Sequence, residues 1–480
     1  MRQNFFRFFS IVFLLAMFLV PQYSFAQLSG TKTIPGDYAT ILAAVTDLNT
    51  QGVGAGGVTF NVAAGHTETL TSETAGTITA TGTLANQIVF QKSGAGANPL
   101  ITAYAWTVAT AFDGMIKIAG GDYITFDGID LQENAANTTI YTDWGYALVK
   151  ASATTPFNGC QFVTIKNSAI TLNKTNTSSI GIYSANHIAT ATTSLTITDP
   201  TDANSNNKFF SNTIGNCYSA ITIAGYAAST PFTLYDQNNE VGVGGGNTIT
   251  NFGGGTVSAR AIYGIYQNGL KIIGNNINSS VVGSTTTVYG IFTNTGTSSN
   301  IDINSNTISL SLATGTYTST VYGINNAIGS TAASNTVNIN NNIVQNCDFS
   351  GFTTGGFTAI LNAGSAATVN VNSNTVSNNI MAGTGTFTGI DGGSATNLNI
   401  TLNTVNGNQK TGASGSMFLT RGSTAIVTYH SNNVYNNSFT ASSGTSSCII
   451  YGYYNFGSPT VENIYNNNIY DCPIVKDEYI

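Results

Sequence analysis

The sequence predicts an all-β chain whose short strands wind into a solenoid of stacked coils. One frame recurs, in which an apolar residue is followed three positions later by Asn and five positions later by Ile or Val, as in "VNSNTV" at 371–376. It returns about every thirty residues, too irregularly for a propeller. A second strand lies halfway through each repeat, as in "VYGIN" at 321–325, with no helical pattern in between. Such strands cannot form βαβ units, but they can form coils stacked about 4.8 Å apart.

The repeated asparagines are interpreted as architectural rather than as ligands. In a stack of coils their side-chain amides lie in register and can hydrogen-bond to their neighbours along the stack. Asn also tolerates the left-handed backbone that a sharp corner between strands demands. The repeated positions are Asn247, Asn275, Asn306, Asn342, Asn374, Asn403, Asn432 and Asn467.

The composition favours a chain with a packed β core. Only 7% of residues are charged and 42% are hydrophobic, with many Val, Ile, Tyr and Phe, which favours a β core over disorder. The net charge is −7 and the sequence contains no basic stripe, so nucleic acid is not predicted as a partner.

The first 26 residues read as a secretory signal peptide. A basic start with Arg2 and Arg7 precedes an apolar run over 8–20, then Pro21 and small residues up to Ala26. The run is too short to span a bilayer, so cleavage after Ala26 is predicted, with an N-terminal anchor helix as the alternative. No later segment could span a membrane. The mature chain is therefore predicted to be secreted, extracellular or on the cell surface.

Two stretches resemble a known family. "DYITFDGIDL" at 122–131 and the "INSNTISL" copy at 303–310 are similar to repeats of secreted bacterial right-handed parallel β-helix proteins with the pectin-lyase-like fold. "DYATILAAVTDLN" at 37–49, followed by "GGVTFNVAAGHTET" at 56–69, resembles that family's capping helix and first strand. The resemblance implies a right-handed parallel β-helix of about eleven or more coils with an N-terminal amphipathic capping helix.

The boundaries follow from this resemblance. Residues 27–120 would form the cap and first coils, and 121–480 the β-helix repeats. In the capping helix, Asp37 is a plausible N-cap. The residues expected on its buried face are Ile41, Leu42, Val45 and Leu48.

The catalytic motifs of this family are missing from the sequence. Its pectin hydrolases carry Asn-x-Asp, Asp-Asp and Gly-His-Gly motifs, and none of these occurs here. No spacing of His, Cys, Asp or Glu suggests a metal ion, and no phosphate loop or nucleophile elbow indicates a cofactor or a serine hydrolase. Neither a metal nor a cofactor is therefore predicted.

One column of residues is the candidate ligand-binding site. Aligning the mid-coil strands places an apolar, inward position before each member, so alternation points the column outward. In one reading Asp391 and Arg421 are a surface ion pair worth about 0.2–1 kcal/mol. In the other, rings and amides form a track for an extended polysaccharide, because sugar faces stack on aromatic rings. The column consists of Tyr266, Phe292, Asn325, Asn362, Asp391, Arg421 and Tyr454.

Two functions from different classes remain open. The first is a secreted or cell-surface module with a structural, adhesive or glycan-binding role. The alternative is a polysaccharide lyase or glycoside hydrolase that acts on acidic polysaccharide, since an Asp with an Arg could abstract a proton beside a uronate carboxylate. No second acid is evident from the sequence, and catalytic residues are not assigned.

Cysteines and the C-terminal repeat carry two further expectations. Cys217, Cys347 and Cys472 occupy one column but lie several coils apart, beyond the Cα separation of about 7 Å that a disulfide allows, so free and largely buried thiols are predicted.

The last repeat is followed only by "PIVKDEYI" at 473–480. Further C-terminal domains or end-to-end contacts are therefore expected.

The repeat frame makes a testable statement about the core. Val405→Asp should be severely destabilising, because it buries an unpaired charge. Thermal unfolding checks this, and an unchanged melting temperature would mean that the frame is off by one residue. The side chains expected to stack inside are Ile308, Val376, Val405, Val434 and Ile469.

Overall fold

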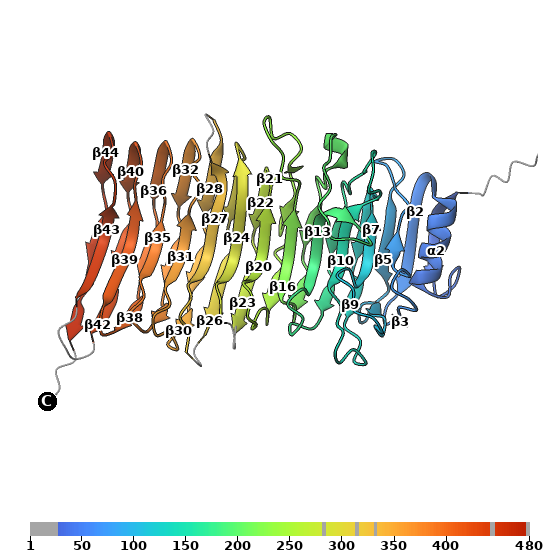
Figure 1. Ribbon diagram of the computed structural model, residues 1–480, viewed down its shortest axis with the longest axis horizontal. Coiled ribbons are helices and arrows are strands. Elements are labelled where there is room, and N and C mark those ends of the chain that lie inside the picture. The colour runs from blue at the N-terminus through green and yellow to red at the C-terminus, as the bar shows by residue number, and fades with distance from the viewer. Residues whose placement is uncertain (1–26, 281–284, 313–315, 331–333, 442–446, 477–480) are drawn as a thin grey trace, which may run out of the picture.

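The computed structural model describes residues 27–280, 285–312, 316–330, 334–441 and 447–476. Over these residues the strands lie side by side along one long axis, with the N-terminal helix at one end (Figure 1). The chain is a right-handed parallel β-solenoid of about 13 turns, which confirms the predicted fold and cap.

The coils build three parallel sheets. The 14-stranded sheet contains β1 (Leu28–Ile34), β2 (Val53–Ala63), β5 (Ile88–Ser93), β8 (Ile124–Asp127), β11 (Thr164–Lys166), β14 (Lys208–Phe210), β18 (Glu240–Val241), β22 (Leu270–Ile273), β25 (Ile301–Asn304), β28 (Thr336–Asn340), β32 (Thr368–Asn372), β36 (Asn397–Thr401), β40 (Ile426–His430) and β44 (Val461–Tyr465). The 12-stranded sheet contains β4 (Thr77–Ile78), β7 (Gly114–Ala119), β10 (Trp144–Lys150), β13 (Ile180–Ile188), β16 (Ser219–Ala224), β20 (Ala259–Ile265), β24 (Val288–Thr297), β27 (Val321–Ser330), β31 (Phe357–Asn362), β35 (Phe387–Asp391), β39 (Gly415–Gly422) and β43 (Cys448–Asn455).

The third sheet has shorter strands and gains a second strand per coil in the C-terminal part of the chain. It contains β3 (Thr67–Thr69), β6 (Leu100–Thr102), β9 (Asp130–Gln132), β12 (Ala169–Thr171), β15 (Thr213–Gly215), β19 (Thr248–Thr250), β23 (Asn276–Ser280), β26 (Thr307–Ser311), β29 (Ile343–Gln345), β30 (Asp348–Phe349), β33 (Thr375–Ser377), β34 (Ile380–Met381), β37 (Thr404–Asn406), β38 (Gln409–Gly412), β41 (Asn433–Tyr435), β42 (Ser438–Ala441), β45 (Asn468–Tyr470) and β46 (Ile474–Lys476). Outside these sheets lie the pair β17 (Asp236–Gln237) and β21 (Gln267–Asn268) and a short 3-10 turn, Pro200–Asp202.

Helix α2 (Ile41–Gln51) covers the N-terminal end of the solenoid (Figure 1). The four apolar residues expected on its inner face are all buried. The predicted N-cap residue, Asp37, is wrong, because the N-cap is Thr40, whose side chain accepts a hydrogen bond from the backbone N–H of Ala43. Asp37 lies too early for that role and instead accepts hydrogen bonds from the N–H and hydroxyl of Thr33. No helix in the described ranges is long and apolar enough to cross a membrane.

The predicted core stack is confirmed up to the last described coil. Val376 pairs with Val405 and Val405 with Val434 in neighbouring strands, and all three side chains are completely buried, as is Ile308. Ile469 continues the same column, paired with Val434, but 46% of its surface is exposed. It belongs to the last described coil, in which no further strand packs against it.

The asparagine at each turn forms a continuous buried ladder. In Asn374, both the backbone N–H and the side-chain Nδ2 donate to Oδ1 of Asn403 in the next coil, at 2.9 and 3.1 Å. Its Oδ1 accepts the same pair of bonds from Asn342, and Nδ2 also donates to the carbonyl of Ile339. The pattern runs from Asn212 through every predicted position to Asn467, which confirms the amide stacking along the solenoid.

The conformational reason predicted for these asparagines is wrong. Except at Asn247, the left-handed backbone belongs to the residue before the ladder Asn, such as Ser373 at φ 57° and Ser431 at φ 55°. The ladder Asn itself is chosen for its amide. A second ladder, which the sequence analysis did not identify, continues from Asn379 through Asn408 to Asn437. There the preceding residue, Asn378 at φ 55°, does take the left-handed role.

The cysteines are free among the described residues, as predicted. Cys217 and Cys347 are buried and Cys472 is half-buried. Cys347 sits in the second ladder, where its backbone N–H donates to Oδ1 of Asn379. Burial raises the pKa of the Cys347 thiol to about 12, so it stays protonated and unreactive.

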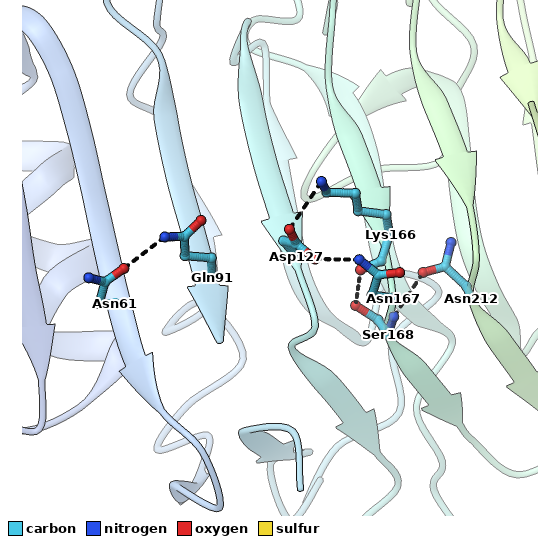
Figure 2. Close-up of polar contacts among 7 residues, drawn as sticks. All are labelled: Asn61, Gln91, Asp127, Lys166, Asn167, Ser168 and Asn212. Atoms are coloured by element: carbon cyan, nitrogen blue, oxygen red, sulfur yellow. Dashed lines mark hydrogen bonds and ion pairs between the residues drawn. The ribbon is translucent and has the colours of Figure 1, made fainter. Parts of the chain in front are cut away.

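The outer face of the 14-stranded sheet is covered by polar side chains that satisfy one another. Figure 2 shows Gln91 donating to Asn61 at 2.8 Å, and Lys166 paired with Asp127 at 3.0 Å. Further along, Glu240 bridges two lysines of adjacent coils. This face therefore presents few uncommitted groups to a ligand.

The ladder can be tested by comparing an inner with an outer asparagine of the same segment. Asn374→Ala should lower the free energy of unfolding by about 3 kcal/mol or more, because it leaves buried donors of Asn342 and a buried acceptor of Asn403 without hydrogen-bond partners. Chemical denaturation measures the effect. Asn370→Ala is the matched control, since its amide bonds Asn338 and Asn399 on the partly exposed outer face, and should cost less than about 1 kcal/mol. Equal losses would contradict a dominant role for the inner ladder.

Candidate functional site

Two columns of side chains run along the outer face of the 12-stranded sheet. Strand pairing places one member of each column in every coil from β20 to β43. The Arg260 column consists of Arg260, Tyr289, Tyr322, Thr358, Thr388, Phe418 and Tyr451. The Asp391 column consists of Tyr263, Phe292, Asn325, Leu361, Asp391, Arg421 and Tyr454, and continues towards the N-terminus with Thr222 and Tyr183.

Aromatic rings from the two columns pack together in the middle of this face. The ring centroids of Tyr263 and Phe292 are 5.4 Å apart, those of Tyr289 and Phe292 4.4 Å, and those of Tyr289 and Tyr322 5.2 Å. All these rings are half-buried. They form a sheet of stacked faces that is open to solvent on one side.

Arg260 lies at the edge of this aromatic cluster, and no described residue forms a hydrogen bond or ion pair with it. Its guanidinium carbon is 4.5 Å from the centroid of the Tyr263 ring and 5.6 Å from that of Phe292, so cation–π attraction holds it. Its Nε is buried, yet across the described residues it makes no hydrogen bond. A guanidinium N–H that is out of water and unpaired costs free energy unless a ligand accepts from it.

A groove of about 460 Å³ opens beside Arg260. Its wall includes Tyr183, Tyr218, Thr222 and Tyr263, so it combines aromatic surface with hydroxyl groups. Tyr218 is itself held by its hydroxyl, which donates to the carbonyl of Val257. The groove thus offers flat apolar surface, hydroxyls and one uncommitted cation, all on one side of the solenoid.

A second hollow of about 570 Å³ borders the first and shares Thr177 with it. Two acids, Asp113 and Asp143, line it, and both are almost completely buried. The backbone N–H of Asp113 donates to Oδ2 of Asp143 at 3.4 Å, and the amide of Asn176 donates to its Oδ1 at 2.8 Å. Burial raises the pKa of Asp143 to about 6, so this carboxyl can hold or release a proton near neutral pH.

Five of the seven residues of the predicted column lie in register. Phe292, Asn325, Asp391, Arg421 and Tyr454 all belong to the Asp391 column, in which Leu361 separates Asn325 from Asp391. The predicted ion pair is present, with Nε and Nη2 of Arg421 each 2.7 Å from Oδ2 of Asp391. Arg421 also lies over the Phe418 ring, 4.9 Å from its centroid. This second cluster resembles the first, except that its cation already has a carboxylate partner.

Tyr266 does not belong to the column. The prediction aligned the Tyr-Gly pair at 263–264 with the pair at 289–290, but Ile262 pairs with Ile291, so Tyr263 takes the expected place. Tyr266 lies beyond the end of β20 in a left-handed conformation at φ 55° and stacks on Tyr235. A repeated dipeptide misled the alignment because the turn length, not the dipeptide, sets the register.

Asn362 is also wrongly placed in the column. Asn325 pairs with Leu361, and Asn362 pairs with Asn326 one position further on. Asn362 is completely buried, accepts a hydrogen bond from the amide of Asn326 at 2.8 Å, and donates to the carbonyl of Gly392. It therefore stabilises the interior instead of facing a ligand.

The sequence analysis missed Arg260, Tyr289 and Tyr322, because strict alternation would place positions three apart on opposite faces. The stacked rings of Tyr289 and Phe292 show that the strand departs from alternation between them. A side chain at the intervening Gly290 would approach the carbonyl of Gly323 to 2.6 Å, so this tight packing needs glycine. The repeated Tyr-Gly pair was the available signal.

No group of three His, Cys, Asp or Glu side chains within the described ranges is arranged to hold a metal ion. The groove also contains no paired phosphate-binding cations, since Arg260 is the one charged residue in the wall of the first hollow. The chemistry that the face offers is therefore ring stacking, hydrogen bonding and a single cationic contact.

The known proteins to which the chain is similar are solved structures of low sequence identity. No family model matches the chain, and no curated protein matches it. Among solved structures it is similar to an alginate lyase from Paenibacillus sp. str. FPU-7 (10% identity, 89% of this chain and 97% of that chain, TM-score 0.35) and to PfbA, a surface adhesin of Streptococcus pneumoniae (14%, 92% and 90%, 0.41). A tailspike protein of E. coli bacteriophage HK620 is also similar (11%, 85% and 74%, 0.34). At such low identities the likeness concerns the fold alone.

The raised pKa of Asp143 predicts a pH dependence of stability. Between about pH 4 and pH 6 the native carboxyl keeps a proton that the unfolded chain has released, so the free energy of unfolding falls as pH rises through this window. In Asp143→Asn this carboxyl no longer titrates. Between pH 4 and pH 7 the free energy of unfolding of the variant should therefore rise by about 1–2 kcal/mol relative to that of the wild type. Denaturation at both pH values measures it. A difference between the two proteins that stays constant with pH would contradict the assignment.

Proposed function

We propose that the chain is a secreted or cell-surface module that binds an extended, anionic glycan along the outer face of its 12-stranded sheet. The observation that carries the proposal is Arg260, a cation packed on aromatic rings in a groove, with a buried Nε that no described residue satisfies. The signal-peptide pattern of residues 1–26, which lie outside the described residues, supports the location.

Aromatic rings favour a glycan over other ligands. Sugar rings present apolar C–H faces that stack on Tyr and Phe, while their hydroxyls need hydrogen-bond partners such as Thr222 and Asn325. Oδ1 of Asn325 is buried and has no partner among the described residues, so it can accept from a ligand hydroxyl. The two columns span seven coils, roughly 30 Å at the strand spacing, which suits a chain of sugars rather than a single small molecule.

The unpaired guanidinium favours a carboxylated or sulfated sugar over a neutral one. A carboxylate or sulfate oxygen can accept from Nε in a short charge-assisted hydrogen bond, and the surrounding rings would strengthen it by excluding water. A neutral sugar hydroxyl could also accept from Nε of Arg260, but this hydrogen bond would contribute less to the free energy of binding.

The binding proposal is tested with the mature chain, residues 27–480, and two matched polysaccharides, one uronate-containing and one neutral. Arg260→Gln should weaken binding to the uronate polymer about tenfold or more and leave binding to the neutral polymer little changed. Tyr289→Ala should weaken both, because it removes stacking surface. Affinity electrophoresis or calorimetry provides the affinities.

Lys208→Gln is the control for charge, since Lys208 is exposed and paired with Glu240 on the 14-stranded sheet. It should bind both polymers like the wild type. If Lys208→Gln and Arg260→Gln lower affinity equally, binding is diffuse electrostatic attraction and the groove is not the site.

Asp113 and Asp143 favour a second candidate function, cleavage of the bound glycan. They lie in the hollow that adjoins the Arg260 groove, and Asp143 has the raised pKa that a general acid needs. In that case the wild type would release new chain ends from the uronate polymer, and Asp143→Asn would abolish release while retaining affinity. If the wild type binds the uronate polymer but releases no new chain ends, the protein is a glycan-binding module and not an enzyme that cleaves the glycan.

A further inference from the structure

A lysine, an asparagine and an aspartate meet in the interior, away from the groove. Lys150 ends strand β10, and only 1% of its surface is exposed. Lysine is almost never fully buried without a charged partner in contact. Among the described residues no carboxylate lies within ion-pair distance of its Nζ, and its one hydrogen bond is to Oδ1 of Asn204, at 2.9 Å.

The amide of Asn204 is held rigidly and its carbonyl is polarised. Oδ1 accepts from the backbone N–H of Cys160 at 2.9 Å as well as from Lys150. Nδ2 donates to the hydroxyl of Ser184 and to the carbonyls of Leu148 and Ala185, all at 3.1 Å. Two donors on the oxygen withdraw electrons from Cγ, and three acceptors fix the plane of the amide.

Asp236 lies in the following coil and is also buried. Its Oδ1 accepts from the backbone N–H of Asn204 at 3.0 Å, and its Oδ2 accepts from Gln267 at 3.1 Å. Burial lowers the pKa of Lys150 and raises the pKa of Asp236. Burial therefore favours the uncharged form of an amine that faces a polarised amide carbonyl, with a carboxyl group nearby and water excluded.

We propose that Lys150 and Asn204 form an intramolecular isopeptide bond that covalently joins two neighbouring coils. Nζ of Lys150 attacks Cγ of Asn204, and the Cys160 N–H stabilises the negative charge that develops on Oδ1. The bond between Cγ and Nδ2 then breaks. One proton of Nζ passes to Nδ2, a second proton of the neutral amine stays on the new amide, and ammonia leaves. No oxidant, reductant or co-reactant is needed.

The position of the bond is suited to stabilising the solenoid. Lys150 closes a strand of one coil, and Asn204 lies in the turn that leads into β14 of the next. A link between residues 54 apart in sequence restricts the unfolded chain as a disulfide of that loop length would. Unlike a disulfide, it is indifferent to reductant.

The test is peptide mapping of the mature wild-type chain. A tryptic digest should contain one species in which the peptide 118–166 is joined to the peptide 175–208, with Lys150 uncleaved and a mass lower by one ammonia, about 17 Da. Fragmentation should locate the junction at Lys150 and Asn204. The intact mass alone does not decide, because an N-terminal Gln27 that cyclises loses the same mass.

Two variants control the assignment. Lys150→Arg keeps a long cationic side chain but cannot form the bond, so the joined species should vanish and the melting temperature should fall. Lys166→Arg changes a surface lysine of the same tryptic peptide and should keep the junction. A wild-type map in which the two peptides appear separately, with Lys150 cleaved, overturns the proposal whether or not the variants fold.

Discussion

Amide stacking along the solenoid axis is the interaction on which the rest of the structure depends. Up to Asn432, each ladder Asn donates twice to the Asn of the next coil and once to a backbone carbonyl, so the corner that it occupies is tied to the same corner of the next coil. These groups are buried, and a buried amide without partners would cost more free energy than the hydrogen bond contributes. The ladder therefore permits one register, in which Asn lies over Asn. Coil spacing, core packing and outer columns all follow from that register.

The outer faces of the two large sheets carry different side-chain contacts between adjacent coils. On the 14-stranded sheet, opposite charges and amides of adjacent coils pair with each other, which leaves that surface saturated. On the 12-stranded sheet, aromatic rings of adjacent coils stack on one another, and Arg260 lies among them with no carboxylate partner among the described residues. Arg421 occupies a similar aromatic setting but is neutralised by Asp391. The difference between these two arginines explains why the N-terminal part of the face is the stronger candidate for an anionic ligand.

Buried charge is concentrated in the N-terminal coils. Lys117, Lys150, Asp143 and Asp236 are all almost completely buried there, whereas in the later coils the described residues bury Asp391 and Lys410. Burial of ionisable groups costs free energy, and a solenoid with a purely structural role could place apolar residues at these positions instead. The proposed isopeptide bond accounts for Lys150, and the hollow beside the Arg260 groove accounts for Asp143. In both places the low dielectric shifts pKa values towards the neutral forms that proton transfer needs.

The sequence by itself determined the fold class, the position of the ladder asparagines, the inward Val and Ile, and the absence of disulfides among the described cysteines. These features repeat at every coil, so one misread copy is corrected by its neighbours. Only the tertiary structure decided which outward residues share a column. Tyr266 and Asn362 were misplaced because turns of unequal length shift the register locally, and Tyr289 was overlooked because the strand departs from alternation beside Gly290. The Arg260 groove and the Lys150–Asn204 contact join residues from different coils, and no periodicity encodes such contacts, since each occurs once and depends on how the intervening loops pack.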